Sequence, residues 1–514
     1  MSAAAKASGG IALHRGPITI AVMLAALMQV LDMTIANVAI PHMEGSFATN
    51  LDSIKWVLTS YIVASAIATP LMGWLAERYG RRNILLIAVA SFSFFSFMVG
   101  SSTALAEIVL MRIFQGVAGA AFTPLAQAIL LDTYPRERHG TAMAIFALGI
   151  LVGPILGPTL GGYITEYYSW RWDFFINIPV GIVTFLMIWN FVPRRPHEAT
   201  RPFDVIGFIL LSIGIGALQY TLDRGSTKNW FASNEIVFAA AAAFVALWIY
   251  PWYATLKKNP FVSMRLFRDR NFSLGIILIL MLGMVLLGTG TLLPPLMQQH
   301  LNYPVLTTGL VLAPRGLGAM IAALIVGRLI TRINPRYLIV AGLLINSASL
   351  YMLSGATLQV TTFFFVSIGF LQGIGLGLTF VPLTTVTFST LPANARNEGT
   401  PIYNLIRNIG SSIGISIVYT LLTRNTQINH AQLGEHLSAF SPTLAHFFHQ
   451  IPMPRANALA FLNQELTHQA AIISYNNDFL LMAGLMLLMV PIALFMRYDF
   501  GSGEPPEAAQ AAME

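Results

Sequence analysis

Long apolar runs, each near the length of a bilayer-crossing helix, recur along almost the whole chain and limit what it can fold into. A helix needs about twenty apolar residues to cross a bilayer. Only 10% of the 514 residues are charged, whereas about 25% are charged in soluble domains. The sequence therefore predicts an all-α integral membrane protein. Its fourteen expected transmembrane helices lie near residues 17–41, 53–76, 83–103, 105–131, 140–163, 172–193, 203–222, 235–256, 271–298, 306–331, 337–357, 361–389, 399–423 and 477–496.

The residue inventory excludes several kinds of chemistry. The sequence has no cysteine, which rules out disulfides, thiolate metal sites and thiol nucleophiles. No histidine lies within the apolar runs, which argues against an intramembrane enzyme such as a lipid transferase. We therefore expect a protein that is not an enzyme. The sequence before the first run lacks the cleavage pattern of a removable signal peptide, so the first run is expected to remain as an anchor.

The placement of positive charge predicts the orientation in the membrane. Lys and Arg are retained in cytoplasmic loops. With a cytoplasmic N-terminus, twenty of the 29 Lys and Arg residues fall on the cytoplasmic side and six on the outer side. The other three, Arg112, Arg315 and Arg407, lie within runs. We therefore expect both termini in the cytoplasm, and we interpret the net charge of +7 as a topology signal and not as a nucleic-acid-binding surface.

An internal repeat relates the fourth and twelfth runs. Residues 114–116 are echoed by 371–373, and Gly140-Thr141 by Gly399-Thr400. Parallel repeats of this kind build one class of secondary transporter and argue against a passive channel. The repeat predicts two six-helix halves with two extra helices between them. The expected division is a cytoplasmic tail at 1–16, an N-terminal half at 17–200, two extra helices at 201–260, a C-terminal half at 261–498 and a cytoplasmic tail at 499–514.

Asp32 is the only charged residue of its run, and Arg112 shares its run only with Glu107 near the start of that run. An ionisable residue in hydrocarbon costs about 2.5 to 3.5 kcal/mol even on the mildest scale, which favours a functional role. The helical rise puts Asp32 roughly 13 Å from Pro41 and Arg112 roughly 10 Å from Leu105, so the pair can meet across a central cavity. Asp32 is the only carboxylate expected deep in a run. Because burial raises the pKa of a carboxyl group and a nearby guanidinium lowers it, we hypothesise that Arg112 controls whether Asp32 holds a proton, and that a proton competes there with the transported compound.

The loop between the second and third runs has a glycine at each end of a charged stretch. Gly80 permits a tight turn there. The full pattern, Gly73, Glu77, Arg78, Gly80, Arg81 and Arg82, resembles the signature inner loop of the major facilitator superfamily, which more often has Asp at the position of Glu77. In that family the loop helps to latch the inner gate, and Asp132 is a candidate partner for Arg78 or Arg81. A plain cytoplasmic anchor would explain the arginines but not the glycines.

Two further stretches resemble superfamily motifs. Arg112 to Gly119 resembles its intramembrane arginine motif, in which Arg112 and Gln115 share one helix face; a purely structural buried arginine is the alternative. The fifth run carries a stripe of small residues that lets two helices approach closely. Its Gly-Pro pairs resemble the motif that marks antiporters, which favours export over import. The motif comprises Gly149, Gly153, Pro154, Gly157, Pro158, Gly161 and Gly162.

Residues 31–41 and 170–179 resemble the fourteen-span drug:proton antiporters of this superfamily, except at Asp173, where an apolar residue is usual. The resemblance extends from Met28 to about Asp478. It implies export of varied hydrophobic drugs, driven by the proton motive force without a cofactor, from a bacterial inner membrane. It also implies a periplasmic adaptor and an outer-membrane channel as partners, beside membrane lipid. A dedicated exporter of one endogenous amphiphile, such as a fatty acid or a siderophore, remains the alternative.

Polar residues on helices that line the cavity in this superfamily are expected to contact substrate. They are Gln29, Asn37, Gln115, Gln372, Asn404 and Arg407, of which Arg407 lines the cavity, caps the inner gate or pairs structurally. The segment 424–476 is expected to face outward, with an amphipathic helix from Pro454 to about Ile473. Its length favours a docking surface. Five histidines there (His430, His436, His446, His449 and His468) lack metal-ligand spacing, so we expect solvated surface instead.

Overall fold

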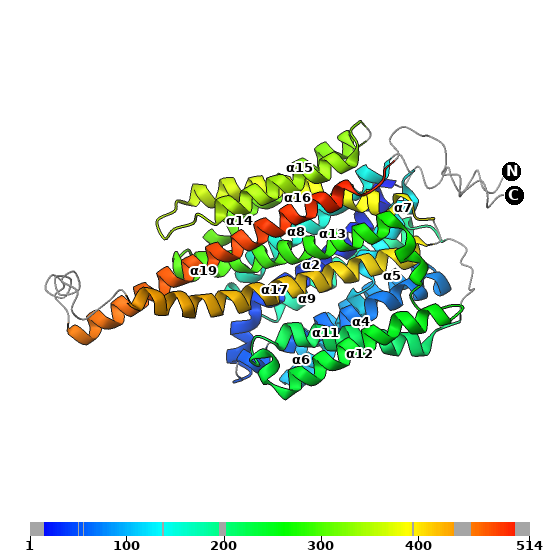
Figure 1. Cartoon of the computed structure of the whole chain (residues 1–514). Coiled ribbons are helices and arrows are strands. Elements are labelled where there is room, and N and C mark those ends of the chain that lie inside the picture. The colour runs from blue at the N-terminus through cyan, green and yellow to red at the C-terminus, as the bar shows by residue number, and fades with distance from the viewer. Residues whose placement is uncertain are drawn as a thin grey trace, which may run out of the picture.

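The computed structural model describes residues 15–49, 51–54, 56–135, 138–194, 202–330, 332–392, 395–435 and 454–498, and within these ranges every regular element is a helix (Figure 1). The expected all-α fold is therefore confirmed. The long helices of the first half and of the central pair are α2 (Arg15–Ser46), α4 (Trp56–Tyr79), α5 (Arg81–Ser101), α6 (Leu105–Gly119), α7 (Phe122–Thr133), α8 (His139–Tyr167), α10 (Asn177–Phe191), α11 (Val205–Arg224) and α12 (Asn234–Leu256). Those of the second half are α13 (Arg270–Pro295), α14 (Val305–Leu329), α15 (Pro335–Leu353), α16 (Thr362–Ser389), α17 (Arg396–Glu435) and α19 (Arg455–Leu494).

The helices agree with the expected transmembrane runs. In the described residues, thirteen helical stretches are long and apolar enough to cross a membrane. Three of them join neighbouring elements: α6 with α7, the short α9 (Trp172–Phe175) with α10, and α13 with the π-helical turn η4 (Leu296–His300). The remaining expected run, 140–163, lies within α8, which is 29 residues long. Every one of the fourteen expected runs is therefore helical.

The segment expected to be a separate outward loop is mostly helical. α17 and α19 are each 40 residues long and extend side by side beyond the rest of the bundle (Figure 1). The amphipathic helix expected from Pro454 does not stop before the last run, because no proline interrupts the chain between Arg455 and Pro491. We call residues 424–435 and 455–474 the hairpin. His436, His446 and His449 lie outside the described residues.

The two expected halves form two packed groups of helices. In the first, α2 packs on α8 and α10, and α6 packs on α4 and α5; in the second, α16 packs on α14 and α15, and α17 packs on α13 and α19. The central pair α11 and α12 pack on each other, and α11 also contacts α4 and α17. The pair therefore lies against both halves.

The halves meet at the end of the bundle opposite the hairpin, which we call the terminal end because α19 ends there. One buried apolar cluster contains Ala126 and Leu130 of α7 together with Val326 of α14 and Val381 of α16. Asn404 of α17 also donates a buried hydrogen bond of 2.7 Å to Gln127 of α7. The terminal end is thus closed by side chains from both halves.

Candidate functional site

The candidate site begins with a close contact between α4 and α6. At Gly116 a Cβ would lie 2.5 Å from the backbone carbonyl oxygen of Tyr61, so only glycine fits there. This approach places the Tyr61 ring over Arg112, with the guanidinium carbon 4.2 Å from the ring centroid. It also lets Arg112 Nε donate to the Val57 carbonyl oxygen at 3.0 Å. The small residue therefore positions the intramembrane arginine.

Asp32 and Arg112 are in direct contact. Arg112 Nη1 donates to Asp32 Oδ2 at 2.5 Å, and neither side chain is exposed. The other carboxylate oxygen accepts from Gln115 Nε2 at 2.9 Å and from Asn177 Nδ2 at 3.0 Å. Arg112 Nη1 also donates to Gln115 Oε1 at 2.9 Å. Four side chains from α2, α6 and α10 thus form one buried polar cluster, which we call the Asp32 cluster.

The position of the cluster differs from the expected one. Asp32 and Arg112 were expected to meet across a central cavity, but all members of the cluster belong to the N-terminal half and are packed inside it. A buried carboxylate is tolerated when it is paired and its oxygens accept hydrogen bonds. One nitrogen, Arg112 Nη2, is buried without a hydrogen-bond partner. The cluster is thus charge-neutral but not fully satisfied.

Burial does not distinguish Asp32 from every other carboxylate. Asp173 of α9 and Asp478 of α19 are each 1% exposed, although both lie near the ends of expected runs. Asp173 accepts a hydrogen bond from Thr165 at 2.5 Å, whereas Asp478 Oδ2 has no partner. What sets Asp32 apart is its arginine partner, because neither of the other two carboxylates forms an ion pair within the described residues.

The residues expected to line the substrate cavity are scattered. Gln29 accepts from Thr123 at 2.8 Å, and Gln115 belongs to the Asp32 cluster. Asn404 bonds across the halves to Gln127. The remaining three differ in exposure: Gln372 is 1% exposed, Arg407 is half-buried, and Asn37 is exposed. The structure does not bring these six residues together into one lining.

The loop motif at the terminal end is braced by its arginines. Gly80 has φ 84°, a left-handed conformation that glycine adopts without strain. Arg81 pairs with Asp132 and also donates to the Ala128 carbonyl oxygen at 3.1 Å. Arg82 donates to the Trp189 carbonyl oxygen at 2.6 Å. Of the two candidates for Asp132, Arg81 is therefore the one that pairs with it, while the Arg78 guanidinium lies over the Trp74 ring at 5.4 Å.

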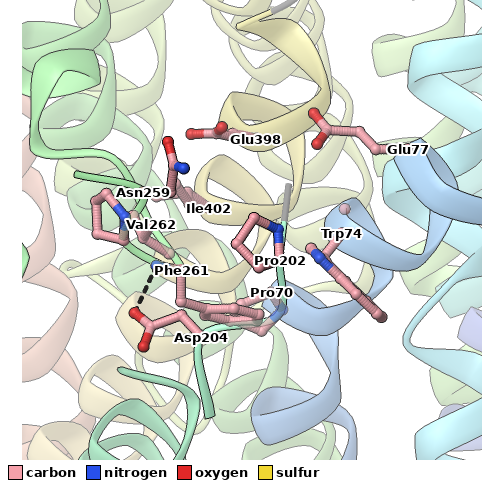
Figure 2. Close-up of a pocket in the computed structure, with 12 residues that line it drawn as sticks. Pro70, Trp74, Glu77, Pro202, Asp204, Asn259, Phe261, Val262, Glu398 and Ile402 are labelled. Atoms are coloured by element: carbon pink, nitrogen blue, oxygen red, sulfur yellow. Dashed lines mark hydrogen bonds between the residues drawn. The ribbon is translucent and has the colours of Figure 1, made fainter. Parts of the chain in front are cut away.

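A small pocket lies beside this motif, at the terminal end. Figure 2 shows that α4 contributes Pro70, Trp74 and Glu77 and that α17 contributes Glu398 and Ile402. Gly73, the first glycine of the motif, also lines it. The chain segments flanking the central helix pair complete it, with Pro202, Asp204, Asn259, Pro260, Phe261 and Val262. The pocket therefore joins the N-terminal half, the central pair and α17.

Asp204 anchors the central helix pair to this pocket. Its buried carboxylate caps α11 by accepting from Gly207 N at 3.1 Å, and it also accepts from Lys257 Nζ at 2.8 Å and from Phe261 N at 3.0 Å. The dashed line in Figure 2 marks the bond from Phe261. Burial by itself would raise the pKa of Asp204, but hydrogen bonds from Lys257, Tyr253 and the two backbone amides lower it below its ordinary value.

The small residues of the fifth run pack α8 onto α2. A Cβ at Gly153 would contact Val30, one at Gly157 would contact Thr34, and one at Gly161 would contact Ile35. Gly149 faces Met23 in the same way, whereas Gly162 is half-buried. Pro154 and Pro158 lie in α8, but their side chains are outside the described residues. The stripe thus holds the helix that carries Asp32.

Three residues of this region escaped the sequence interpretation. Asn177 binds Asp32, Tyr61 covers Arg112, and Gln127 joins the halves. Asn177 and Gln127 are uncharged amides in apolar runs, which is a weaker signal than a charge. Tyr61 is an aromatic residue in an apolar run, and its sequence position alone does not single it out.

Comparison with known proteins agrees with the fold and the motifs. A family model described as Major Facilitator Superfamily matches residues 22–415. Multidrug export protein EmrB of Escherichia coli (strain K12) is 36% identical over 491 residues, covering 94% of this chain and 96% of that protein. Fatty acid resistance protein FarB of Neisseria gonorrhoeae is 35% identical over 491 residues, covering 95% of this chain and 97% of that protein.

Solved structures show the same fold at low identity. The proton:xylose symporter XylE has a TM-score of 0.60 at 14% identity, covering 93% of this chain and 96% of that one. The human organic anion transporter MFSD10 has a TM-score of 0.61 at 13% identity, covering 93% and 99%. The family model, the two-half fold and the relatives agree, and the chain therefore belongs to the major facilitator superfamily of membrane transporters.

Proposed function

We propose that this protein is a proton-coupled antiporter that exports varied hydrophobic and amphipathic drugs from the cytoplasm or the inner leaflet. The main support is the Asp32 cluster, a buried carboxylate paired with one arginine inside a transporter fold. Separating the partners of a buried ion pair strands a charge and costs about 3 to 5 kcal/mol. Protonation of Asp32 removes the negative charge of the pair and so raises the free-energy cost of keeping the charged Arg112 buried. Proton uptake and rearrangement around α2 and α6 are thereby linked.

Export of several drugs is further supported by the relatives, since EmrB is named as a multidrug export protein. The Gly-rich face of α8 gives additional support because it packs directly on α2, the helix of Asp32. A change at Asp32 is therefore transmitted to the helix that carries the antiporter-like motif. Protons are the driving ion in this proposal, and no cofactor takes part.

The proposal is tested by Asp32→Asn in proteoliposomes with an imposed pH gradient. Drug transport driven by the gradient is expected to be lost, while the variant still elutes as a folded monodisperse protein. Glu44→Gln, a carboxylate change on the same helix outside the Asp32 cluster, is the matched control and is expected to transport normally. Normal gradient-driven transport by Asp32→Asn would refute the assignment.

The hairpin supports a second part of the proposal, assembly with a periplasmic adaptor (EmrA-like) and an outer-membrane channel (TolC-like). With both termini in the cytoplasm of a bacterial cell, the hairpin projects into the periplasm. It is held together by Asn429 Nδ2 donating to Ser474 Oγ at 2.9 Å, and it exposes Ile428, Leu459 and Phe461. Exposed apolar side chains on a projecting element favour a protein partner. Co-purification with a membrane-anchored adaptor, lost on replacing the three apolar residues by Ser, tests this part.

A dedicated exporter of one endogenous amphiphile is the second candidate. It is favoured by the similarity to FarB, which is named for fatty acid resistance. Growth of a pump-deleted strain complemented with this protein, challenged with single compounds, separates the two. Protection against chemically unrelated drugs supports the first candidate, whereas protection against one class of amphiphile supports the second.

A further inference from the structure

The two halves can be compared position by position. Packing relates α4 and α6 to α14 and α16, because Gly116 contacts the backbone of Tyr61 just as Gly373 contacts the backbone of Arg315. The sequence gives the same register. Gly73, Arg78 and Arg82 recur with equal spacing as Gly327, Arg332 and Arg336, and Gln115 recurs as Gln372. Tyr61 and Arg315 are therefore equivalent positions.

The same comparison identifies the counterpart of Asp32. In the N-terminal half, Gly153 and Gly157 of α8 contact Val30 and Thr34, which flank Asp32. In the C-terminal half, two glycines of α17 contact two residues of α13 with the same spacing: Gly410 meets Leu280 and Gly414 meets Met284. The position between them that corresponds to Asp32 is occupied by Leu282, which is 2% exposed.

The C-terminal half thus contains an arginine but not its carboxylate. Arg315 is half-buried in the middle of α14 and donates to the Leu286 carbonyl oxygen at 3.4 Å. This long contact is its only hydrogen bond or ion pair among the described residues. Arg112, in contrast, donates to Asp32, Gln115 and Val57. A guanidinium carries five donors, so most of those of Arg315 are left without a protein acceptor.

Gln372 gives a second, independent observation at the same place. It lies on α16 between Gly369 and Gly373, both of which approach Arg315. The side chain is 1% exposed, yet its Oε1 has no hydrogen-bond partner. Its counterpart Gln115 accepts from Arg112 and donates to Asp32. Because Oε1 is an acceptor, the group that completes it is a donor such as the Arg315 guanidinium, in the way that Arg112 completes Gln115 Oε1. An anion that accepts from both Arg315 and Gln372 Nε2 would hold the two side chains in that arrangement, and would relieve the cost of the unsatisfied amide.

We propose that Arg315 and Gln372 form a binding site for the carboxylate of an amphiphilic organic acid. The inference rests on the proposed export function and names a substrate class for it. The ligand carboxylate takes the role in the C-terminal half that Asp32 takes in the N-terminal half: it accepts from the Arg315 guanidinium and from Gln372 Nε2. The apolar body of the ligand then lies among the hydrophobic side chains of α13 and α14. A cationic amphiphile gains nothing from this site, because Arg315 repels it.

The test compares two probes of equal chain length but opposite charge, decanoate and decyltrimethylammonium. Binding of each radiolabelled probe is measured on purified protein in detergent at about pH 8, where a carboxylic acid is ionised. Arg315→Gln is expected to weaken decanoate binding about tenfold or more, because the hydrogen bonds to a charged group are lost. Binding of decyltrimethylammonium is expected to be unchanged, and Arg315→Lys is expected to restore part of the decanoate affinity.

A second pair of variants leaves Arg315 in place. Leu282→Asp supplies the carboxylate that the N-terminal half has at Asp32, so it is expected to pair with Arg315 and abolish decanoate binding. Leu282→Asn is the matched control: it has nearly the same shape and no charge, and decanoate binding is expected to persist. Equal loss with both Leu282 variants would overturn the proposal. So would wild-type decanoate affinity in Arg315→Gln, or equal loss of both probes in that variant.

Failure of the site and failure of the export function give different results. Gradient-driven transport of a cationic drug by Arg315→Gln at the wild-type rate, together with lost decanoate binding, supports both. If decanoate binding depends on Arg315 while the wild-type protein shows no gradient-driven transport of any drug, the site stands and the export function fails. If transport occurs but decanoate binding is independent of Arg315, only the site fails.

Discussion

Substitution of Gly116 by Ala tests whether the contact between α4 and α6 sets the geometry of Arg112. The added Cβ would lie 2.5 Å from the Tyr61 carbonyl oxygen and 3.1 Å from its Cα. Because these are backbone atoms, relief requires the helices to separate, by roughly 1 Å to reach ordinary contact distance. Overpacking of this kind costs about 1 to 3 kcal/mol. A separation of that size would also stretch the 3.0 Å bond from Arg112 Nε to the Val57 carbonyl oxygen beyond hydrogen-bonding range.

The measurement is thermal unfolding of the purified protein in detergent, followed by intrinsic fluorescence. Gly116→Ala is expected to lower the melting temperature by a few degrees and to slow gradient-driven transport. Gly484→Ala is the matched control, because nothing lies within 4 Å of a Cβ at that helical position. There the change removes only the helix penalty of glycine, and up to about 1 kcal/mol of stabilisation is expected. A melting temperature for Gly116→Ala at or above that of the wild type would refute the reasoning.

Two further predictions concern the terminal end. Arg81→Gln and Asp132→Asn are each expected to slow transport, and the double variant is expected to be no slower than either single one, because both remove the same ion pair; additive losses in a transport assay would contradict this. Asp204→Asn is expected to lower the melting temperature at neutral pH by removing the negative charge that pairs with Lys257. Since the pKa of Asp204 is lowered in the folded protein, its contribution is present above the unfolded value of about 3.9 and is lost as the pH falls through the folded value. Melting curves between about pH 3 and 7 are therefore expected to converge in acid, and a constant difference between wild type and variant would contradict the assignment.

The sequence predicts the helices of this protein better than their contacts. Runs of about twenty apolar residues leave few alternatives to membrane helices, and all the expected ones are present. The length of the hairpin could not be predicted in this way, because polar residues such as those of 424–435 form helix as readily as loop when no Pro interrupts them. The mean hydropathy of a segment reports its preference for lipid, not the point at which a helix ends.

Charge was the most informative local signal for the candidate site, and uncharged amides were the weakest. Asp32 and Arg112 could be singled out because each costs free energy when it lies unpaired in lipid. That the two meet inside one half depends on where the bundle places α2 and α6, which single-residue reasoning does not specify. Asn177 and Gln127 were missed for the same reason, since an amide in an apolar run has many possible partners. The spacing of the loop motif in the two halves already aligns Tyr61 with Arg315. The contacts of Gly116 with Tyr61 and of Gly373 with Arg315 were needed to establish that alignment.

The contacts that close the terminal end and those of the Asp32 cluster respond to different motions. If the halves move as rigid bodies during transport, distances between halves change while distances within a half are kept. The bond from Asn404 to Gln127 would then break, whereas the pair of Asp32 and Arg112 would persist. Rigid-body motion alone therefore leaves the ion pair formed, and in the proposed antiport mechanism its separation requires a rearrangement within the N-terminal half. Because α6 and α7 form one continuous span, a displacement of the helix that carries Arg112 is expected to move the one that carries Gln127 and Asp132.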